Sequence, residues 1–121
     1  MANVDVAETA IAAFPYPATV LTWTPLTAAN PNGTAIIRPQ LRDKSVQFTG
    51  TFDSATATLT GSNDGTNYKI LTDPLGNTLS FTDVAGPTQI SEITAYIRPA
   101  SSGGGGSQSI TCIIVGTNNK V

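Results

Sequence analysis

Hydrophobic and polar residues alternate along much of this chain, the pattern of β-strands that bury one face. The alternation runs through residues 18–24 and 55–60, where threonines separate apolar residues. In residues 45–52 it places Val46, Phe48 and Phe52 on one face, with Gly50 as an expected bulge or close-approach point. Longer apolar runs predict two further strands, in residues 90–98 and 109–115.

Turn-forming residues separate these segments. Residues 62–67 (SNDGTN) predict a hairpin turn in which Gly65 takes a positive φ, and residues 73–77 predict a second tight turn. Gly86-Pro87 predicts a third turn, and the glycines at 103–106 predict a mobile loop between the last two strands. Seven or eight short strands with such turns predict an all-β fold. The expected architecture is a jelly-roll-like antiparallel β-sandwich, with an immunoglobulin-like sandwich as the alternative.

The first 17 residues differ from the rest of the chain. Residues 5–13 (DVAETAIAA) are expected to form a short helix, which the prolines of Phe14-Pro15-Tyr16-Pro17 end. We interpret residues 1–17 as an N-terminal arm that packs under its own sandwich or reaches a neighbouring molecule. With 121 residues in the chain, residues 18–121 are expected to form a single β-sandwich domain.

Charged residues are scarce, at 12% of the chain, and the net charge is −2. The basic residues are Arg38, Arg42, Lys44, Lys69, Arg98 and Lys120. They form no stripe that neutralises several phosphates and no polybasic patch, so we expect neither nucleic acid nor membrane as a partner. The N-terminus carries Asp5 where a secretory signal carries a base, so we expect synthesis in a cytoplasm without export.

Candidate chemistry is sparse, because the chain has no histidine and a single cysteine. Cys112 lies in an apolar run and is expected to be a buried core residue. One cysteine and no histidine exclude a structural zinc site, whereas calcium could take oxygen ligands from Asn63, Asp64, Asp73, Asn77 and Asp83. These residues lie in turn sequences without a defined calcium-loop spacing, so the prediction for them is turn formation. We predict no enzyme activity, no catalytic residue, no cofactor and no metal site.

Residues 50–98 carry a family resemblance. The phrases Gly50-Thr51-Phe52, ATLTGSNDGTNY (57–68), DPLGN (73–77) and YIRP (96–99) resemble small virion proteins of tailed phages, above all capsid cement or decoration proteins. The phrase "SNDGTNY … YIRP" is also similar to discoidin-like, galactose-binding jelly rolls. Those domains usually have a terminal cysteine pair and exposed aromatic or basic loop tips, whereas this chain has one internal cysteine and loop tips of Gly, Ser, Asn and Thr.

The resemblance implies a function. It implies a structural virion protein that lies on the outer surface of a phage head and bridges major capsid protein subunits, typically as a homotrimer. The partner-binding residues expected from the arm and from the 30–44 loop are Phe14, Tyr16, Arg38, Arg42 and Lys44. Two alternatives stay open, a carbohydrate-binding module and another virion part such as a tail, fibre or head–tail component. Trp23, flanked by Thr22 and Thr24, is expected in the core rather than as a sugar-stacking ring.

Overall fold

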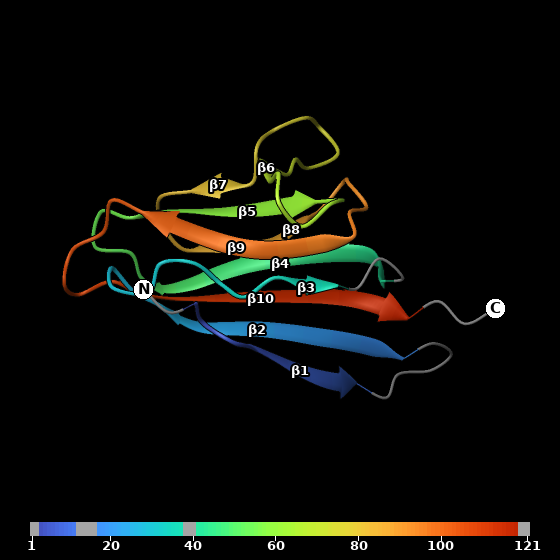
Figure 1. The fold of residues 1–121 in the computed structure, drawn as a ribbon, viewed down its shortest axis with the longest axis horizontal. Coiled ribbons are helices and arrows are strands. Elements are labelled where there is room, and N and C mark those ends of the chain that lie inside the picture. The colour runs from blue at the N-terminus through green and yellow to red at the C-terminus, as the bar shows by residue number, and fades with distance from the viewer. Residues whose placement is uncertain (1–2, 12–16, 38–40, 119–121) are drawn as a thin grey trace.

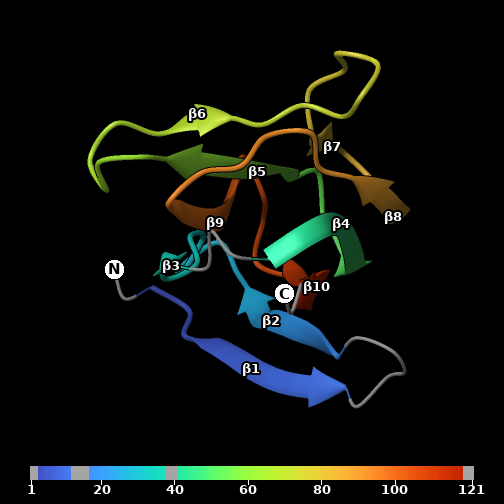
Figure 2. The same ribbon diagram turned by 90° about the vertical axis from the view of Figure 1, so that its right-hand side faces the viewer.

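The computed structural model describes residues 3–11, 17–37 and 41–118, and these form two antiparallel sheets with the core between them (Figures 1 and 2). The described residues contain strands and turns but no helix. The predicted all-β class is therefore confirmed, and the two packed sheets have the form of a β-sandwich.

Strand pairing defines the two sheets. The first sheet contains, in spatial order, β1 (Val6–Ile11), β2 (Ala18–Leu26), β10 (Ser109–Asn118), β4 (Leu41–Thr51) and β8 (Ala85–Gln89). The second sheet contains, in spatial order, β3 (Ile36–Ile37), β9 (Tyr96–Ser102), β5 (Thr56–Ser62) and β6 (Lys69–Ile70), with β7 (Ser80–Phe81) also paired to β5. All the strand pairs are antiparallel, and the longest ones join β10 to β2 and to β4.

The core is filled by the side chains that the alternation places inward. Phe48 and Val46 of β4 lie in it with Phe52, as predicted. Trp23 and Cys112 are fully buried in the same core, which confirms both assignments. Apolar side chains from both sheets meet here, so the two sheets share one hydrophobic core.

The helix predicted in residues 5–13 is wrong, because Val6–Ile11 is a strand. It pairs with β2 from Val6 opposite Trp23 to Ile11 opposite Ala18 and forms an edge of the first sheet. Alanine and glutamate favour a helix locally, but the backbone groups of this segment find their partners on β2, and tertiary pairing overrides the propensity.

The strands after residue 84 are shifted from the predicted ones. Gly86-Pro87 lies within β8 rather than in a turn. β8 is an edge strand, and an edge strand tolerates proline because its open side needs no N–H donor for a neighbouring strand. Residues 90–95 form no strand, and β9 begins at Tyr96.

The predicted hairpin and its turn are present. β5 pairs with β6, Gly65 has φ +78°, and the carboxylate of Asp64 accepts main-chain hydrogen bonds from Thr66 and Asn67 at 2.8 Å each. The second predicted turn is also confirmed, since the Asp73 carboxylate accepts hydrogen bonds from the main chain of its own turn.

The glycine-rich loop joins β9 to β10 as predicted, but it is fastened to the β4–β5 turn. The Asp53 carboxylate accepts a hydrogen bond from the Ser107 main chain at 3.0 Å, and the Asp53 carbonyl accepts one from Gly105 at 3.1 Å. A Cβ added to Gly104 would overlap the side chain of Gln108, which is buried. The loop is thus a packed part of the fold, not the free tip that its composition predicts.

Gly50 is a close-approach point, as predicted. Its φ is +107°, and an added Cβ would overlap the carbonyl oxygen of Ser109 on β10. Glycine permits this contact between the two strands because it has no side chain.

Candidate functional site

The outer face of the first sheet is the broadest surface that the pairing register builds. The inner positions of β2, β10 and β4 carry buried residues such as Leu21, Cys112 and Phe48. The side chains between them therefore point outward, because successive side chains of a strand alternate between faces. Neighbouring strands continue this face in register, with Ala7, Thr22, Ile113 and Gln47 forming one row across four strands.

Leaving out Thr51 and Ser109 at one end and Arg42 at the other, we define the outer face by fourteen outward residues of these four strands. They are Ala7, Thr9 and Ile11 of β1, Ala18, Val20, Thr22 and Thr24 of β2, Thr111, Ile113, Val115 and Thr117 of β10, and Ser45, Gln47 and Thr49 of β4. None of the fourteen is charged, whereas Arg42 of β4, which pairs with Thr117 at the end of this face, is exposed and charged. Val20 lies opposite Val115 near the middle of the face, and the Thr24 and Thr111 hydroxyls share a 2.7 Å hydrogen bond at its edge.

Such a face is unusual for a sheet surface. Antiparallel sheets with one solvated face normally place polar and charged side chains on it. Here most β-branched side chains of β2 and β10 are half-buried, and those of β1 are exposed. The acids lie elsewhere, with Asp64 and Asp73 in turns. The outer face thus resembles the core of a protein interface, which is depleted of charge.

On the second sheet, residues of the phrase "SNDGTNY … YIRP" pack against one another and have structural roles. The Arg98 guanidinium lies 4.2 Å from the centre of the Tyr68 ring, a cation–π contact. A Cβ on Gly65 would lie 3.1 Å from the Tyr96 ring, so this glycine lets the turn pack on the aromatic side chain. The phrase "SNDGTNY … YIRP" therefore builds the hairpin and its packing.

A β-bulge shapes the start of β4. The register with β10 shifts between Val115 and Thr117, and Asp43 has φ +51°, which is rare for a non-glycine residue. Such a bulge re-aims the next side chain. Lys44 consequently points inward, is only 6% exposed, and packs its stem near Gly116.

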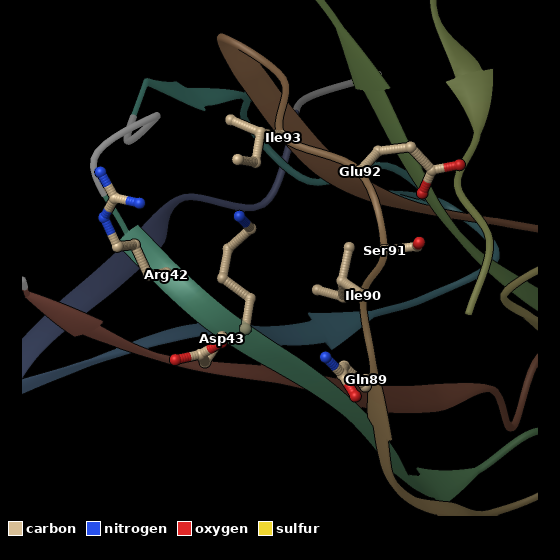
Figure 3. Close-up of a pocket in the computed structure, with 8 residues that line it drawn as sticks. Arg42, Asp43, Gln89, Ile90, Ser91, Glu92 and Ile93 are labelled. Carbon is tan, nitrogen blue, oxygen red and sulfur yellow. The ribbon is translucent and has the colours of Figure 1, made fainter. Parts of the chain in front are cut away.

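A hollow of about 410 Å³ lies beside this bulge, lined by residues 42–44 and 89–93 (Figure 3). Lys44 lines it, and its ammonium group donates a 3.2 Å hydrogen bond to the Leu41 carbonyl. Burial lowers the pKa of Lys44, and the charge of the Asp43 carboxylate acts in the opposite direction. The Glu92 carboxylate, also at the hollow, accepts hydrogen bonds from the Thr72 main chain and hydroxyl at 2.9 and 2.6 Å.

The residues predicted to bind a partner are distributed as follows. Arg42 is exposed and lines the hollow, whereas Lys44 lies beneath the surface instead of on the open loop that the sequence suggests. Phe14, Tyr16 and Arg38 lie outside the described residues. The outer face was missed at the sequence level, because alternation identifies outward residues within one strand but not which strands adjoin.

The turn acids serve the fold, as predicted. Hydrogen bonds from its own turn, first that of the Asn77 main chain, hold the pKa of Asp73 below its usual range. Among the described residues, no three Asp, Glu or Cys side chains come together as a metal site would require. Burial raises the pKa of the Cys112 thiol well above its usual value, so the sulfur stays protonated.

No helix in the described part of the chain has the length and apolar character needed to span a bilayer. Comparison of the chain with protein families, with curated proteins and with solved structures finds no match.

Proposed function

We propose that this chain is a structural virion protein, a cement or decoration protein on the outer surface of a tailed-phage head. The observation that carries the proposal is the uncharged outer face of the first sheet. A surface made mainly of Thr, Val, Ile and Ala side chains loses little charge hydration when another protein covers it. The resemblance of residues 50–98 to cement proteins and the scarcity of charge in the whole chain add support.

The mechanism is bridging of major capsid protein subunits. Each copy buries surface on more than one subunit, so separating those subunits also breaks the contacts of the cement protein. Binding that is restricted to the mature, expanded lattice stabilises that lattice by mass action.

The size of the outer face favours attachment through several contacts. Four strands about 4.8 Å apart, with about seven residues of about 3.4 Å each, give a face of roughly 450 Å². A standard interface buries about 800 Å² on each partner. One face alone therefore supports a weak contact, whereas a homotrimer would hold three such faces to one lattice and release slowly.

The arm and the start of β4 complete the proposed contact region. In this proposal the 1–17 segment contributes through the open edge of β1 and through Phe14 and Tyr16, and the 38–44 segment through Arg38 and Arg42. Lys44 is buried and lines the hollow, so in this proposal a partner reaches it there. The proposal also implies that the strands of this β-sandwich have a jelly-roll-like connectivity.

The carbohydrate-binding alternative has less support. Sugar-binding modules stack sugars on exposed rings, whereas Trp23 is fully buried and Tyr68, Phe81 and Tyr96 are half-buried. Among the described residues no Phe, Tyr or Trp is exposed. Another virion part, such as a tail, fibre or head–tail component, would use the same uncharged face and differs only in its partner.

A shell-rescue experiment tests the proposal. Purified heads that lack the protein should rupture at lower temperature or under milder osmotic stress than heads that carry it. Adding the protein back should restore resistance and saturate at a fixed ratio to the major capsid protein, because the lattice offers a finite set of sites. Heads equally robust with and without the protein would refute bridging. Retention of the protein on immobilised polysaccharide would then favour the carbohydrate-binding alternative.

A further inference from the structure

The hollow at the start of β4 contains a buried cation that the described residues around it satisfy incompletely. Lys44 is 6% exposed, and its ammonium carries three donors. Among the described residues this group forms one hydrogen bond, the 3.2 Å contact to the Leu41 carbonyl. Removing an ammonium group from water is costly unless acceptors or an anion replace the water. The hollow therefore presents hydrogen-bond donors with positive charge to whatever enters it.

The acids that line the hollow leave this cation without a direct partner. The Glu92 carboxylate is engaged by the Thr72 main chain and hydroxyl, and in Figure 3 it points away from β4. The Asp43 side chain is exposed and in Figure 3 also points away from the 89–93 segment. Both acids line the hollow, so their charges oppose a ligand with two negative charges more than one with a single charge.

The remaining walls combine a second cation with apolar side chains. Arg42 is exposed at the rim, and a guanidinium binds a carboxylate through two parallel hydrogen bonds. Ile90 is buried and Ile93 is 64% exposed, and in Figure 3 both extend from the 89–93 segment toward β4. Cations beside apolar walls suit a ligand that has one negative charge and a short hydrocarbon stem.

We propose that this hollow binds a carboxylate group on a short aliphatic stem, with Lys44 and Arg42 holding the carboxylate and Ile90 and Ile93 covering the stem. A free fatty-acid-like carboxylate and a Glu side chain of a partner protein share this chemistry. The inference does not depend on the capsid proposal, because it rests on the hollow alone.

The test is a titration of the full ¹⁵N-labelled chain followed by NMR. The probes are sodium hexanoate, 1-hexanol as the uncharged match, and sodium phosphate as the more highly charged anion. Hexanoate should shift the amide signals of residues 42–44 and 89–93 saturably, with a Kd that is roughly millimolar for a ligand of this size. Hexanol and phosphate should bind at least about tenfold more weakly.

Two variants assign the binding to the cations. Lys44→Met keeps the aliphatic stem over Gly116 and removes the ammonium, so hexanoate affinity should fall at least about tenfold. Arg42→Gln, at an exposed position that leaves the core untouched, should lower it several-fold. Lys69→Met removes a charge from exposed β6 that interacts with Glu92 but does not line the hollow, and it should lower the affinity far less than Lys44→Met does.

Two peptides distinguish the sources of the carboxylate. Acetyl-Ala-Glu-Ala-amide binding more tightly than hexanoate, with no binding of its Gln counterpart, would assign the hollow to a protein partner. Hexanoate binding alone would assign it to a free carboxylate. Equal shifts with hexanol, tighter binding of phosphate, full hexanoate affinity in Lys44→Met, or no saturable shift with any carboxylate would each overturn the proposal.

Discussion

The indole N–H of Trp23 donates a 2.8 Å hydrogen bond to the main-chain carbonyl of Thr34, eleven residues further along the chain. The backbone before Thr34 passes directly over the ring, since a Cβ added to Gly33 would lie 2.5 Å from the indole. This contact anchors the loop between β2 and β3 to the centre of the core.

Replacing Trp23 with Phe should destabilise the fold by about 2 kcal/mol. The substitution removes a donor from a fully buried side chain, leaves the Thr34 carbonyl without that partner, and opens a small cavity. Urea denaturation followed by circular dichroism measures the change. Thr22→Val, on the outer face of the same strand, is the control and should stay within about 0.5 kcal/mol. An unchanged midpoint for Trp23→Phe would show that the indole contact is not formed.

Replacing Lys44 with Met should raise stability at neutral pH by at least about 1 kcal/mol, because a buried charge that forms one hydrogen bond among the described residues becomes an apolar side chain. The pKa of Lys44 is lowered in the folded chain, so between that value and the ordinary 10.5 the unfolded chain binds more protons. The wild-type protein therefore gains stability as pH rises through this window, and the advantage of the variant should shrink by pH 10.5.

Thermal unfolding at pH 7 and at pH 10.5 measures this difference. Lys69→Met, on exposed β6, is the matched control and should change the melting temperature little at either pH. A variant that is less stable than wild type at pH 7 would contradict the account of Lys44.

Replacing Asp64 with Asn should lower the melting temperature at pH 6, and the difference should disappear in acid. Main-chain donors of Asn67 and then Thr66 hold the pKa of Asp64 well below its usual range, with the Asn67 amide and the Ser62 hydroxyl adding to the effect. The stability that the carboxylate contributes is present above its ordinary pKa of 3.8 and is lost as pH falls toward the lowered folded value.

Melting curves between pH 6 and pH 2 check this prediction. Asp83→Asn is the comparison, because the Asp83 carboxylate accepts one main-chain hydrogen bond, from Val84, and should matter less. Equal effects of the two substitutions would show that the turn does not depend on the Asp64 carboxylate.

Replacing Gly65 with Val should destabilise the protein by more than about 1 kcal/mol. A β-branched residue is strained at φ +78°, and its Cβ would press on the Tyr96 ring at 3.1 Å. Gly86→Ala on β8 is the control: nothing lies within 4 Å of its added Cβ, so its stability should be unchanged or slightly higher. Denaturant midpoints compare the two, and no loss in Gly65→Val would place the turn elsewhere.

Replacing Val115 with Lys should weaken rescue of cement-free heads at least about tenfold while the protein stays folded. The substitution puts a hydrated charge in the middle of the uncharged outer face, opposite Val20. Thr56→Lys introduces the same charge on β5 of the second sheet and should rescue normally. Titration of heads with each variant, read as rupture temperature, separates them. Equal rescue by both would move the contact to another surface.

The sequence by itself determined the class of the fold and much of its local structure. Alternation is a property of one strand, so the buried positions of β4 and the burial of Trp23 follow from it without knowledge of the partners. Turn chemistry is equally local, since Asp64 and Gly65 need only their own neighbours to form the hairpin turn.

Only the tertiary structure decided the features that depend on pairing. Residues 6–11 are a strand because β2 offers backbone partners, and Pro87 is accepted within β8 because that strand lies at an edge. Lys44 is buried because a bulge against β10 turns it inward. The outer face exists because β1, β2, β10 and β4, which are distant in sequence, lie side by side in register. Each of these features depends on which backbone groups pair across the chain, and that pairing is fixed only when the sheets form.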